Sequence, residues 1–433
     1  MSTLNPFIRN SDSKSSTKTN NFFILLVYTL KWLGLCLLVG FLAGTASAWF
    51  LLALAEATTF RENNLWIITL LPLGGILIAA LYKYFGKEVI KGNNQLIEEI
   101  QKPRKIVPLA MAPLIFFGTV ATHLFGGSAG REGSAVQMGG SIADQFTRLF
   151  NLKKRDRRIL LMCGISAGFA SVFGTPLAGA VFALEVFIVG SLVYEAILPS
   201  FLAAVIAHYT CLLWGAHHSH YHIENVPEIN IPYVLLAIVA GILFGLTGRL
   251  FSKANHFSSS FFKKYISNDL LRPVGGALIV MAFVWLWGGT EFIGLGLPTI
   301  SASFEQPQPF YSFLIKLILT AITLGAGFKG GEVTPLFFVG ATLGSFLSLF
   351  MPLPVDLLAG MGFVAVFTAA ANTPLACILM GIELFGAAPA MYIAIACVMA
   401  YLFSGHSGIY ASQIIGSPKH GAWAREKGAN LRK

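Results

Sequence analysis

The chain has 433 residues, of which 55% are hydrophobic and 12% are charged, and its mean hydropathy is +0.70. Soluble domains usually contain about 25% charged residues, so this composition excludes a soluble enzyme or a nucleic-acid-binding protein. The formal net charge of +10 does not indicate nucleic acid, because the basic residues lie in short segments between apolar stretches.

The apolar stretches, taken in chain order, predict membrane-spanning helices, since a bilayer span needs roughly 20 apolar residues. They lie at 22–56, 65–82, 107–125, 159–190, 231–248, 274–288, 333–350 and 357–371. None has the alternating pattern of a β-barrel strand, so we predict an all-α polytopic membrane protein. The polar residues 1–20 are expected to be a disordered cytoplasmic start without a cleavable signal peptide, and the first helix to be its own insertion signal.

The distribution of Lys and Arg predicts the topology. Basic clusters lie at 83–105, 148–158, 249–272 and 419–433, whereas the segment 215–231 contains no Lys or Arg. By the positive-inside rule the clusters and both termini are cytoplasmic, in a cell inner membrane, and the segment 215–231 faces outward. The helices at 22–56 and 231–250 then cross the membrane in opposite directions.

The two halves of the chain also repeat in sequence. Gly-Arg-Glu-Gly-Ser at 130–134 recurs as Gly-Gly-Glu-Val-Thr at 330–334, and Thr-Pro-Leu-Ala occurs at 175–178 and again at 373–376. An inverted repeat is typical of transporters, which bind substrate between the repeats; a duplication kept only for packing is the alternative. The expected domains are a transmembrane domain at 21–418, with repeats at 21–214 and 231–418, and a short cytoplasmic tail at 419–433.

The repeated blocks predict glycine-rich turns that lead into helix starts, at 92–94, 130–133 and 331–335. A helix N-terminus presents free N–H groups and the positive end of the macrodipole, so it suits an anion. Such a site holds an anion weakly enough to release it, as permeation requires. The candidate anion-binding residues at these starts are Asn93, Asn94, Arg131, Gly133, Val333 and Thr334.

Glu132 is the most informative candidate, because carboxylates inside a membrane usually mark ion or proton pathways. At a helix start its side chain can occupy the anion's own site and leave it on protonation, so that one residue is both gate and proton carrier. The alternative is a structural Glu132, paired with Arg131 or with a backbone turn.

These motifs resemble the CLC chloride channel and transporter family. The resemblance rests on Gly-Arg-Glu-Gly at 130–133, Gly-Gly-x-x-x-Pro at 330–335 and the paired Pro-Leu-Ala motifs, and it extends over about 20–418. It implies an inverted-topology repeat of tilted, partly re-entrant helices, a homodimer with one anion pathway per subunit, and a gating glutamate at Glu132.

Departures from the chloride-type pattern favour one branch of that family. Gly-Asn-Asn-Gln-Leu stands at 92–96, where chloride-type members usually carry Gly-Ser-Gly-Ile-Pro, and Gly-Glu-Val-Thr-Pro stands at 331–335. Both are similar to the bacterial fluoride/proton antiporter branch. That resemblance implies that Asn93 lies in the filter, Thr334 near the gate and Tyr410 at the inner end of the pathway.

The expected function is therefore fluoride/proton antiport that exports fluoride from a bacterial cytoplasm, with no enzymatic activity. Chloride-transporting relatives carry an internal proton-transfer glutamate where this chain has Val186, and fluoride-type members manage coupling without it. The neighbouring Glu185 and its repeat mate Glu383 are expected to be structural and to close helix ends. A chloride/proton antiporter or a passive chloride channel of the same fold is the alternative.

Two sequence features suggest other classes of function, a serine hydrolase and a metal transporter. Residues 126–130 match Gly-x-Ser-x-Gly, which with His123, His208 or His406 would suggest a serine hydrolase, but that motif needs a strand–turn–helix context. The histidine-rich segment 217–222 suggests metal transport, but we favour a solvated loop. The five cysteines lie in apolar stretches without CxxC spacing and are expected to be buried. No metal or cofactor is expected.

Overall fold

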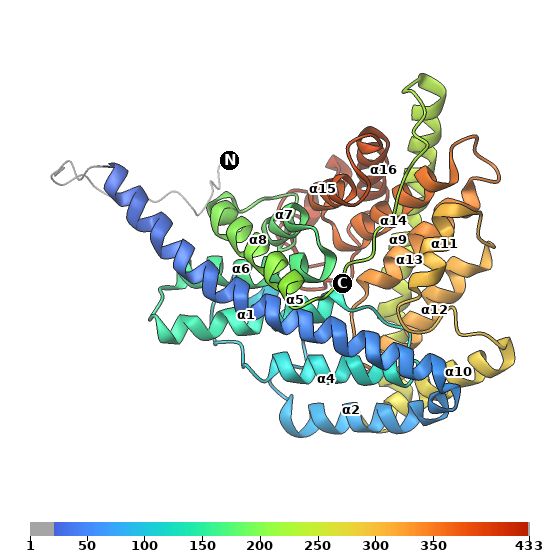
Figure 1. Cartoon of the computed structure of the whole chain (residues 1–433), viewed down its shortest axis with the longest axis horizontal. Coiled ribbons are helices and arrows are strands. Elements are labelled where there is room, and N and C mark those ends of the chain that lie inside the picture. Colours follow the sequence, from blue (N-terminus) through green and yellow to red (C-terminus); the bar gives the residue numbers. More distant parts are fainter. Residues whose placement is uncertain (1–20, 432–433) are drawn as a thin grey trace.

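A computed structural model describes residues 21–431, so the predicted disordered start at 1–20 lies outside the described residues (Figure 1). The first half consists of α1 (Asn21–Asn63), the 3-10 helix η1 (Leu65–Leu70), α2 (Leu71–Phe85), α3 (Asn93–Gln101), α4 (Met111–Leu124), α5 (Glu132–Leu149), α6 (Lys154–Phe173), α7 (Pro176–Glu185), the 3-10 helix η2 (Tyr194–Ala196) and α8 (Ile197–Leu213).

The second half is also helical. It consists of α9 (Ile231–Tyr265), α10 (Arg272–Trp287), α11 (Leu297–Glu305), α12 (Tyr311–Gly325), α13 (Val333–Leu347), α14 (Val355–Ala371), α15 (Pro374–Phe385), α16 (Ala390–Phe403) and the 3-10 helix η3 (Gly421–Glu426). Two short strands, β1 (Ile188–Val189) and β2 (Ile414–Ile415), pair in parallel and bring the end of the chain beside the first half.

The helices agree with the predicted apolar stretches, with one break and several additions. The stretch 159–190 is two helices, because Gly174 ends α6 with a φ of +77° and Pro176 begins α7. Several helices lie outside the predicted stretches, namely α3, α5, α8, α11, α12, α15 and α16. Among residues 21–431, four helical segments are long and apolar enough to span a membrane, and other apolar helices have only 10–17 residues.

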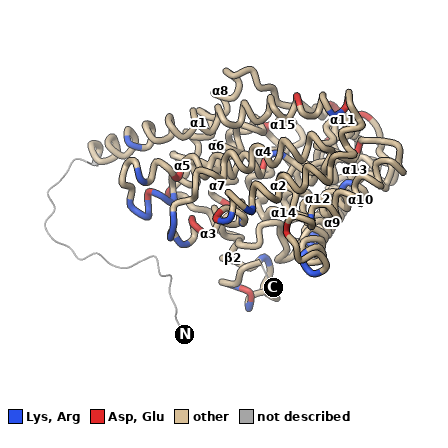
Figure 2. Tube along the Cα trace, turned by 90° about the horizontal axis from the view of Figure 1, so that it is seen from below, with Lys and Arg blue, Asp and Glu red and all other residues tan. Residues whose placement is uncertain are grey.

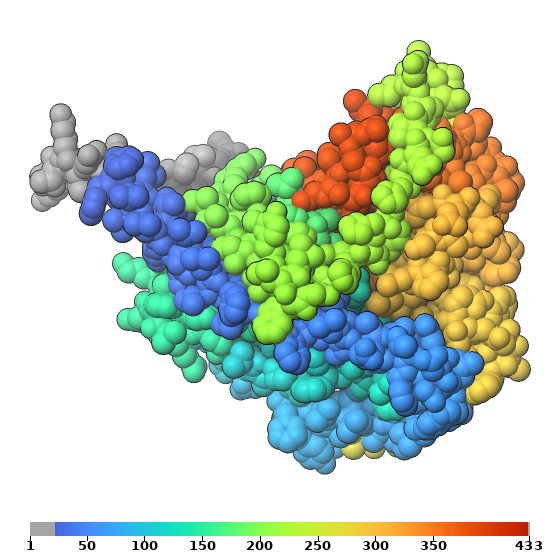
Figure 3. All heavy atoms as spheres, viewed as in Figure 1, coloured from blue at the N-terminus to red at the C-terminus, as the bar shows by residue number. Residues whose placement is uncertain are grey.

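The outer surface of the fold is apolar, as a membrane protein requires. In Figure 3 the long helix α1 lies across the face of the molecule, with little covering it. Its side chains Leu37, Phe41 and Trp49 are 49%, 52% and 57% exposed. Lipid is the solvent that accommodates such a surface.

Reciprocal hydrogen bonds relate the two repeats by an approximate two-fold axis. Glu383 of α15 accepts hydrogen bonds from the first backbone N–H groups of α7, at Leu177 and Ala178, both at 2.8 Å. Glu185 of α7 accepts the equivalent bonds from α15, at Leu375 (3.2 Å) and Ala376 (2.9 Å). Equivalent residues exchange equivalent contacts across a two-fold axis. Each carboxylate therefore caps a helix of the opposite repeat, as expected for a structural role.

Close helix crossings also repeat. A Cβ atom on Gly139 of α5 would lie 2.1 Å from the carbonyl oxygen of Gly164 in α6, and one on Gly340 of α13 would lie 2.0 Å from that of Gly362 in α14. Membrane helices approach this closely only where both carry small residues. These crossings fix α5 and α13, the helices whose N-termini form the candidate site.

Replacing Gly340 with Val should prevent a stable fold, because the side chain would overlap the α14 backbone. We expect the free energy of unfolding to fall by at least about 3 kcal/mol, the upper end of overpacking penalties. Gly34→Val is the matched control, since no atom lies within 4 Å of a Cβ there, and it should stay within about 0.5 kcal/mol of the parent. The yield of monodisperse protein and the thermal midpoint in detergent are the measurements; equal behaviour of both variants would contradict the crossing.

A buried ion-pair network holds α3 against α5 and α6. Arg157 of α6 donates to Asp144 of α5 at 2.8 and 2.7 Å and to Glu99 of α3 at 3.0 Å. Breaking such a buried pair on one side leaves a charge without compensation. Because α3 begins with Asn93, the network positions one of the predicted anion-binding residues.

The basic residues gather on one side of the molecule. Figure 2 shows most Lys and Arg positions toward the side where α3, one end of α9 and the C-terminus lie. The segment after 418 is packed rather than extended, since the Lys419 ammonium contacts the Tyr401 carbonyl (2.8 Å) and the Ser404 hydroxyl (2.9 Å). The five cysteines are buried and form no disulfide.

Candidate functional site

Three helices begin at the predicted turns, which confirms the expected helix starts. The helix α3 begins at Asn93, α5 at Glu132 and α13 at Val333. Gly92, which precedes α3, has a φ of +54°, and a Cβ there would lie 3.0 Å from the Gln137 side chain. Glycine is therefore required at this turn.

The glycine turns of the two repeats pair directly with each other. Gly130 and Gly331 form an antiparallel bridge, in which each N–H donates to the other's carbonyl at 2.7 Å. A Cβ on Gly133 would lie 3.2 Å from Gly331 Cα and 3.0 Å from the Asn93 Nδ2 atom. The bridge thus brings the starts of α5 and α13 together, with the side chain of Asn93 beside them.

The Glu132 carboxylate lies at the N-terminus of α13. Its Oε2 atom accepts a hydrogen bond from the Thr334 backbone N–H at 3.0 Å, and the Thr334 hydroxyl donates to the carboxylate at 2.6 to 2.7 Å. The Arg131 Nε atom lies 3.5 Å from Oε1, and Glu132 is 2% exposed. The carboxylate oxygens therefore occupy a position where helix N–H groups would bind a free anion.

The remaining predicted residues at the helix starts differ in the contacts that they make. Asn93 is beside Gly133, and its buried Oδ1 atom has no hydrogen-bond partner among residues 21–431. Asn94 is engaged elsewhere, because its Oδ1 atom accepts from the Ser412 N–H at 2.9 Å. Val333 is buried at the first position of α13.

Tyr410 is buried in the segment that follows α16 and lines a cavity of about 160 Å³, here called the Tyr410 cavity. Its ring packs against Phe182 with a centroid distance of 6.4 Å. The Gln413 amide fixes this segment by donating to the carbonyls of Val186 (2.7 Å) and Ala371 (2.8 Å). The cavity is also lined by Asn93, Asn94, Lys91, Lys329 and Glu332.

Glu332 is a candidate that the sequence analysis did not include. It lies in the Tyr410 cavity, 3.4 Å from the Asn255 amide, and its carboxylate forms no ion pair among the residues that the structure describes. Its position was available in the sequence, because Glu332 is the repeat mate of Glu132. A second, half-buried carboxylate thus lies beside the helix starts.

A second, larger cavity of about 540 Å³ is here called the Arg131 cavity. Arg131 and Arg61 line it, and Arg61 donates to the His123 carbonyl at 2.8 Å. Arg131 also lines a smaller cavity of about 30 Å³, together with Glu132, Thr334 and Tyr221. Arg131 therefore lies between the Arg131 cavity and the small cavity that Glu132 and Thr334 line.

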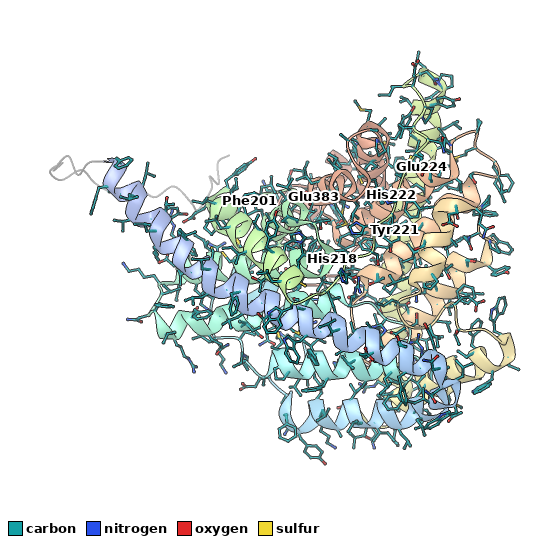
Figure 4. The ribbon with its side chains drawn as sticks, in the orientation of Figure 1. Phe201, His218, Tyr221, His222, Glu224 and Glu383 are labelled. Carbon is teal, nitrogen blue, oxygen red and sulfur yellow. The ribbon has the colours of Figure 1, made fainter. Side chains whose placement is uncertain are left out.

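The histidine-rich segment, predicted to be a solvated loop, is solvated only in part: His217, His220 and His222 are exposed, whereas His218 is half-buried. His218 Nε2 lies 2.9 Å from the Ser171 carbonyl, and its ring stacks on His208 at 5.5 Å. Figure 4 shows His218, Tyr221 and His222 in succession along the connection from α8 to α9. Within the described part of the chain, no three His, Cys, Asp or Glu residues are grouped to hold a metal.

The hydroxyl of Ser128, the serine of the Gly-x-Ser-x-Gly match, already forms hydrogen bonds with other residues. The Ser128 hydroxyl donates to the Phe292 carbonyl at 3.1 Å and lies 3.0 Å from the Thr320 hydroxyl. Both ring nitrogens of His123 lack a hydrogen-bond partner among the described residues, so they do not contact Ser128. The serine–histidine pair of a hydrolase is therefore not formed.

The fold and site together define a polytopic membrane protein of the transporter and channel class, built from an inverted repeat around paired helix N-termini. A family model described as voltage-gated chloride channel matches residues 74–405. The chain therefore belongs to this family, the CLC family that the motifs resemble, whose members are channels and transporters.

The chain is also similar to individual members of this family. The chain is 52% identical over 402 residues to a chloride/fluoride channel protein of Pseudomonas syringae pv. tomato, covering 92% of this chain and 89% of that protein. It is 28% identical over 390 residues to an H⁺/Cl⁻ exchange transporter of Vibrio cholerae, covering 81% of each. It superposes on the crystal structure of a CLC-type fluoride/proton antiporter with a TM-score of 0.86, at 37% identity over 90% of this chain and 98% of that one.

Proposed function

We propose that the protein is a fluoride/proton antiporter that exports fluoride from a bacterial cytoplasm. The observation that carries this proposal is the Glu132 carboxylate at the start of α13, held by the Thr334 N–H and hydroxyl. A protonated Glu132 loses its negative charge and therefore its attraction to these donors. Fluoride then takes its place, and the proton travels with the side chain.

Fluoride selectivity is assigned to hydrogen-bond donors rather than to a fixed cation. Fluoride is small and strongly hydrated, so it needs several good donors when its water is removed. The proposed donors are the Asn93 amide, the Thr334 hydroxyl, the Tyr410 hydroxyl and helix N–H groups. The names of the Pseudomonas relative and of the superposed antiporter support fluoride.

Chloride/proton antiport is the second candidate, because the Vibrio relative exchanges chloride by its name. Purified protein in liposomes distinguishes the two functions. Fluoride efflux should exceed chloride efflux at equal concentrations, and protons should enter as fluoride leaves. If chloride moves as readily as fluoride, the protein is a chloride transporter or a passive chloride channel of this fold.

We further propose a homodimer in the inner membrane with cytoplasmic termini. An apolar groove of about 480 Å³ lies between the two repeats and contains Leu177, Val181, Phe201, Leu375, Ile378 and Leu379. A concave apolar surface in lipid is filled better by the complementary surface of a second copy than by acyl chains. The basic side in Figure 2 supports the orientation, since cytoplasmic loops are rich in Lys and Arg.

Cysteine labelling tests this orientation. A cysteine at Ser219, in the connection from α8 to α9, should react with an impermeant thiol reagent in intact cells, whereas one at Lys154 should react only after lysis. Lys154 lies at the start of α6 in a basic cluster, which the positive-inside rule assigns to the cytoplasm. Labelling at Lys154 but not at Ser219 in intact cells would reverse the proposed topology.

A further inference from the structure

The Tyr410 cavity contains two lysines in different electrostatic situations. The Lys91 side chain is 63% exposed, and its ammonium lies 2.6 Å from a Glu98 carboxylate oxygen. The Lys329 ammonium forms no ion pair and no hydrogen bond within residues 21–431. Lys329 therefore supplies a positive charge that no neighbouring carboxylate neutralises by direct contact.

The structure holds Lys329 in a fixed place. It belongs to the connection between α12 and α13, directly before Gly330 and Gly331 of the paired glycine turn. Its Cβ atom would lie 3.0 Å from a Cβ on Gly118, and its ammonium lies 4.1 Å from the ring centroid of Tyr82. A cation over an aromatic face is attracted to it without losing its charge.

This charge lies in the cavity beside the candidate anion-binding residues. The cavity that Lys329 lines also contains Asn93 at the start of α3 and Glu332 directly before α13, so it adjoins two of the three helix starts. A narrow cavity with low-dielectric walls focuses the field of a single charge and raises the local concentration of counter-ions by tenfold or more. Lys91 contributes little to such a field, because it is exposed and paired.

We propose that the positive charge of Lys329 attracts anions into the pathway at its Tyr410 end. It attracts fluoride into the cavity and delivers it to the donors of the helix starts, without being a ligand of the anion held there. This inference rests on the proposed function for the identity of the anion. In this role Lys329 changes how often an anion occupies the pathway. It does not change proton transport by Glu132.

Charge variants in liposomes test this role. Lys329→Gln should raise the half-saturating fluoride concentration about tenfold at low ionic strength, with a much smaller change in maximal rate. The difference should shrink as an inert salt screens the field. Lys329→Arg should keep the parent value, and the matched control Lys91→Gln should change it by less than about twofold. A salt-independent loss shared by Lys329→Gln and Lys329→Arg would overturn the proposal.

Chemical modification separates charge from packing. Lys329→Cys should behave as Lys329→Gln does, and an aminoethyl thiosulfonate reagent, which restores a positive charge, should recover the parent half-saturation. The uncharged propyl reagent should not, although it fills the same space. The native cysteines are buried, so the unmutated protein treated with each reagent is the control. Equal recovery with both reagents would show that Lys329 acts through packing and contradict the inference.

Failure of this inference is distinct from failure of the proposed function. If the protein prefers chloride, the fluoride assignment is wrong, but the same variants can be compared with chloride as the transported anion. If fluoride/proton antiport is found and Lys329→Gln has the parent half-saturation, only the role of Lys329 is wrong.

Discussion

Glu132→Gln should abolish proton transport coupled to fluoride and leave a folded protein. The amide has the shape of a protonated carboxyl group and cannot bind or release a proton at working pH. Its oxygen can still accept from Thr334, whose N–H and hydroxyl hold the native carboxylate at 3.0 Å and 2.6 Å. Fluoride-dependent proton uptake into liposomes should therefore fall to the level of protein-free vesicles.

Glu383→Gln is the matched control for this variant. Glu383 is also a carboxylate that accepts N–H groups at a helix start, but it caps α7 from the other repeat. Its replacement should preserve coupling and lower the free energy of unfolding by about 1 kcal/mol, the usual loss for a weakened cap. Coupled proton uptake that survives in Glu132→Gln would exclude Glu132 as the proton carrier.

Asn93→Ser should reduce the preference for fluoride over chloride by about tenfold to a hundredfold. A hydrogen bond to a charged partner contributes about 1.5–3 kcal/mol, and each 1.4 kcal/mol corresponds to about a factor of ten. The Asn93 amide nitrogen is placed for this role, because it lies beside Gly133 at the start of α5. Serine offers a single, shorter donor that still serves chloride.

The ratio of initial fluoride and chloride efflux rates measures this change. Asn64→Ser is a suitable control, since the Asn64 amide donates only to the Phe60 carbonyl at the end of α1, outside the cavities of the site. An unchanged ratio in Asn93→Ser would remove Asn93 from the selectivity determinants and leave the Thr334 and Tyr410 hydroxyls as the remaining candidates.

The arrangement of the site could be predicted from the sequence where glycine, proline and the repeat specify the backbone. The starts of α3, α5 and α13 follow glycine-rich turns, and the Gly130–Gly331 bridge joins positions that the repeat already relates. The pairing of Thr334 with Glu132 depends on tertiary structure, and the family resemblance alone placed Thr334 near the gate.

Other features could not be found by hydropathy and spacing. The helix α12 contains the charged residue Lys316, so its sequence is not predicted as an apolar stretch. The Lys316 ammonium is buried and donates to the carbonyls of Phe292 (3.2 Å) and Gly294 (2.7 Å). The helix α16 has 14 residues, and no apolar stretch is predicted at its position, although stretches nearly as short are predicted at 274–288 and 357–371. The ion-pair state of Lys329 depends on which carboxylates the fold brings near it, and no pattern along the chain specifies that.

In the proposed antiport, the movements of fluoride and protons are coupled through Glu132. The most direct test of this coupling is proton pumping in liposomes that contain the purified protein, with the membrane potential held at zero and no initial pH difference. An outward fluoride gradient should drive protons inward against the pH difference that then develops, and an equal chloride gradient should drive far fewer. Fluoride efflux without inward proton movement would contradict antiport and identify a passive channel.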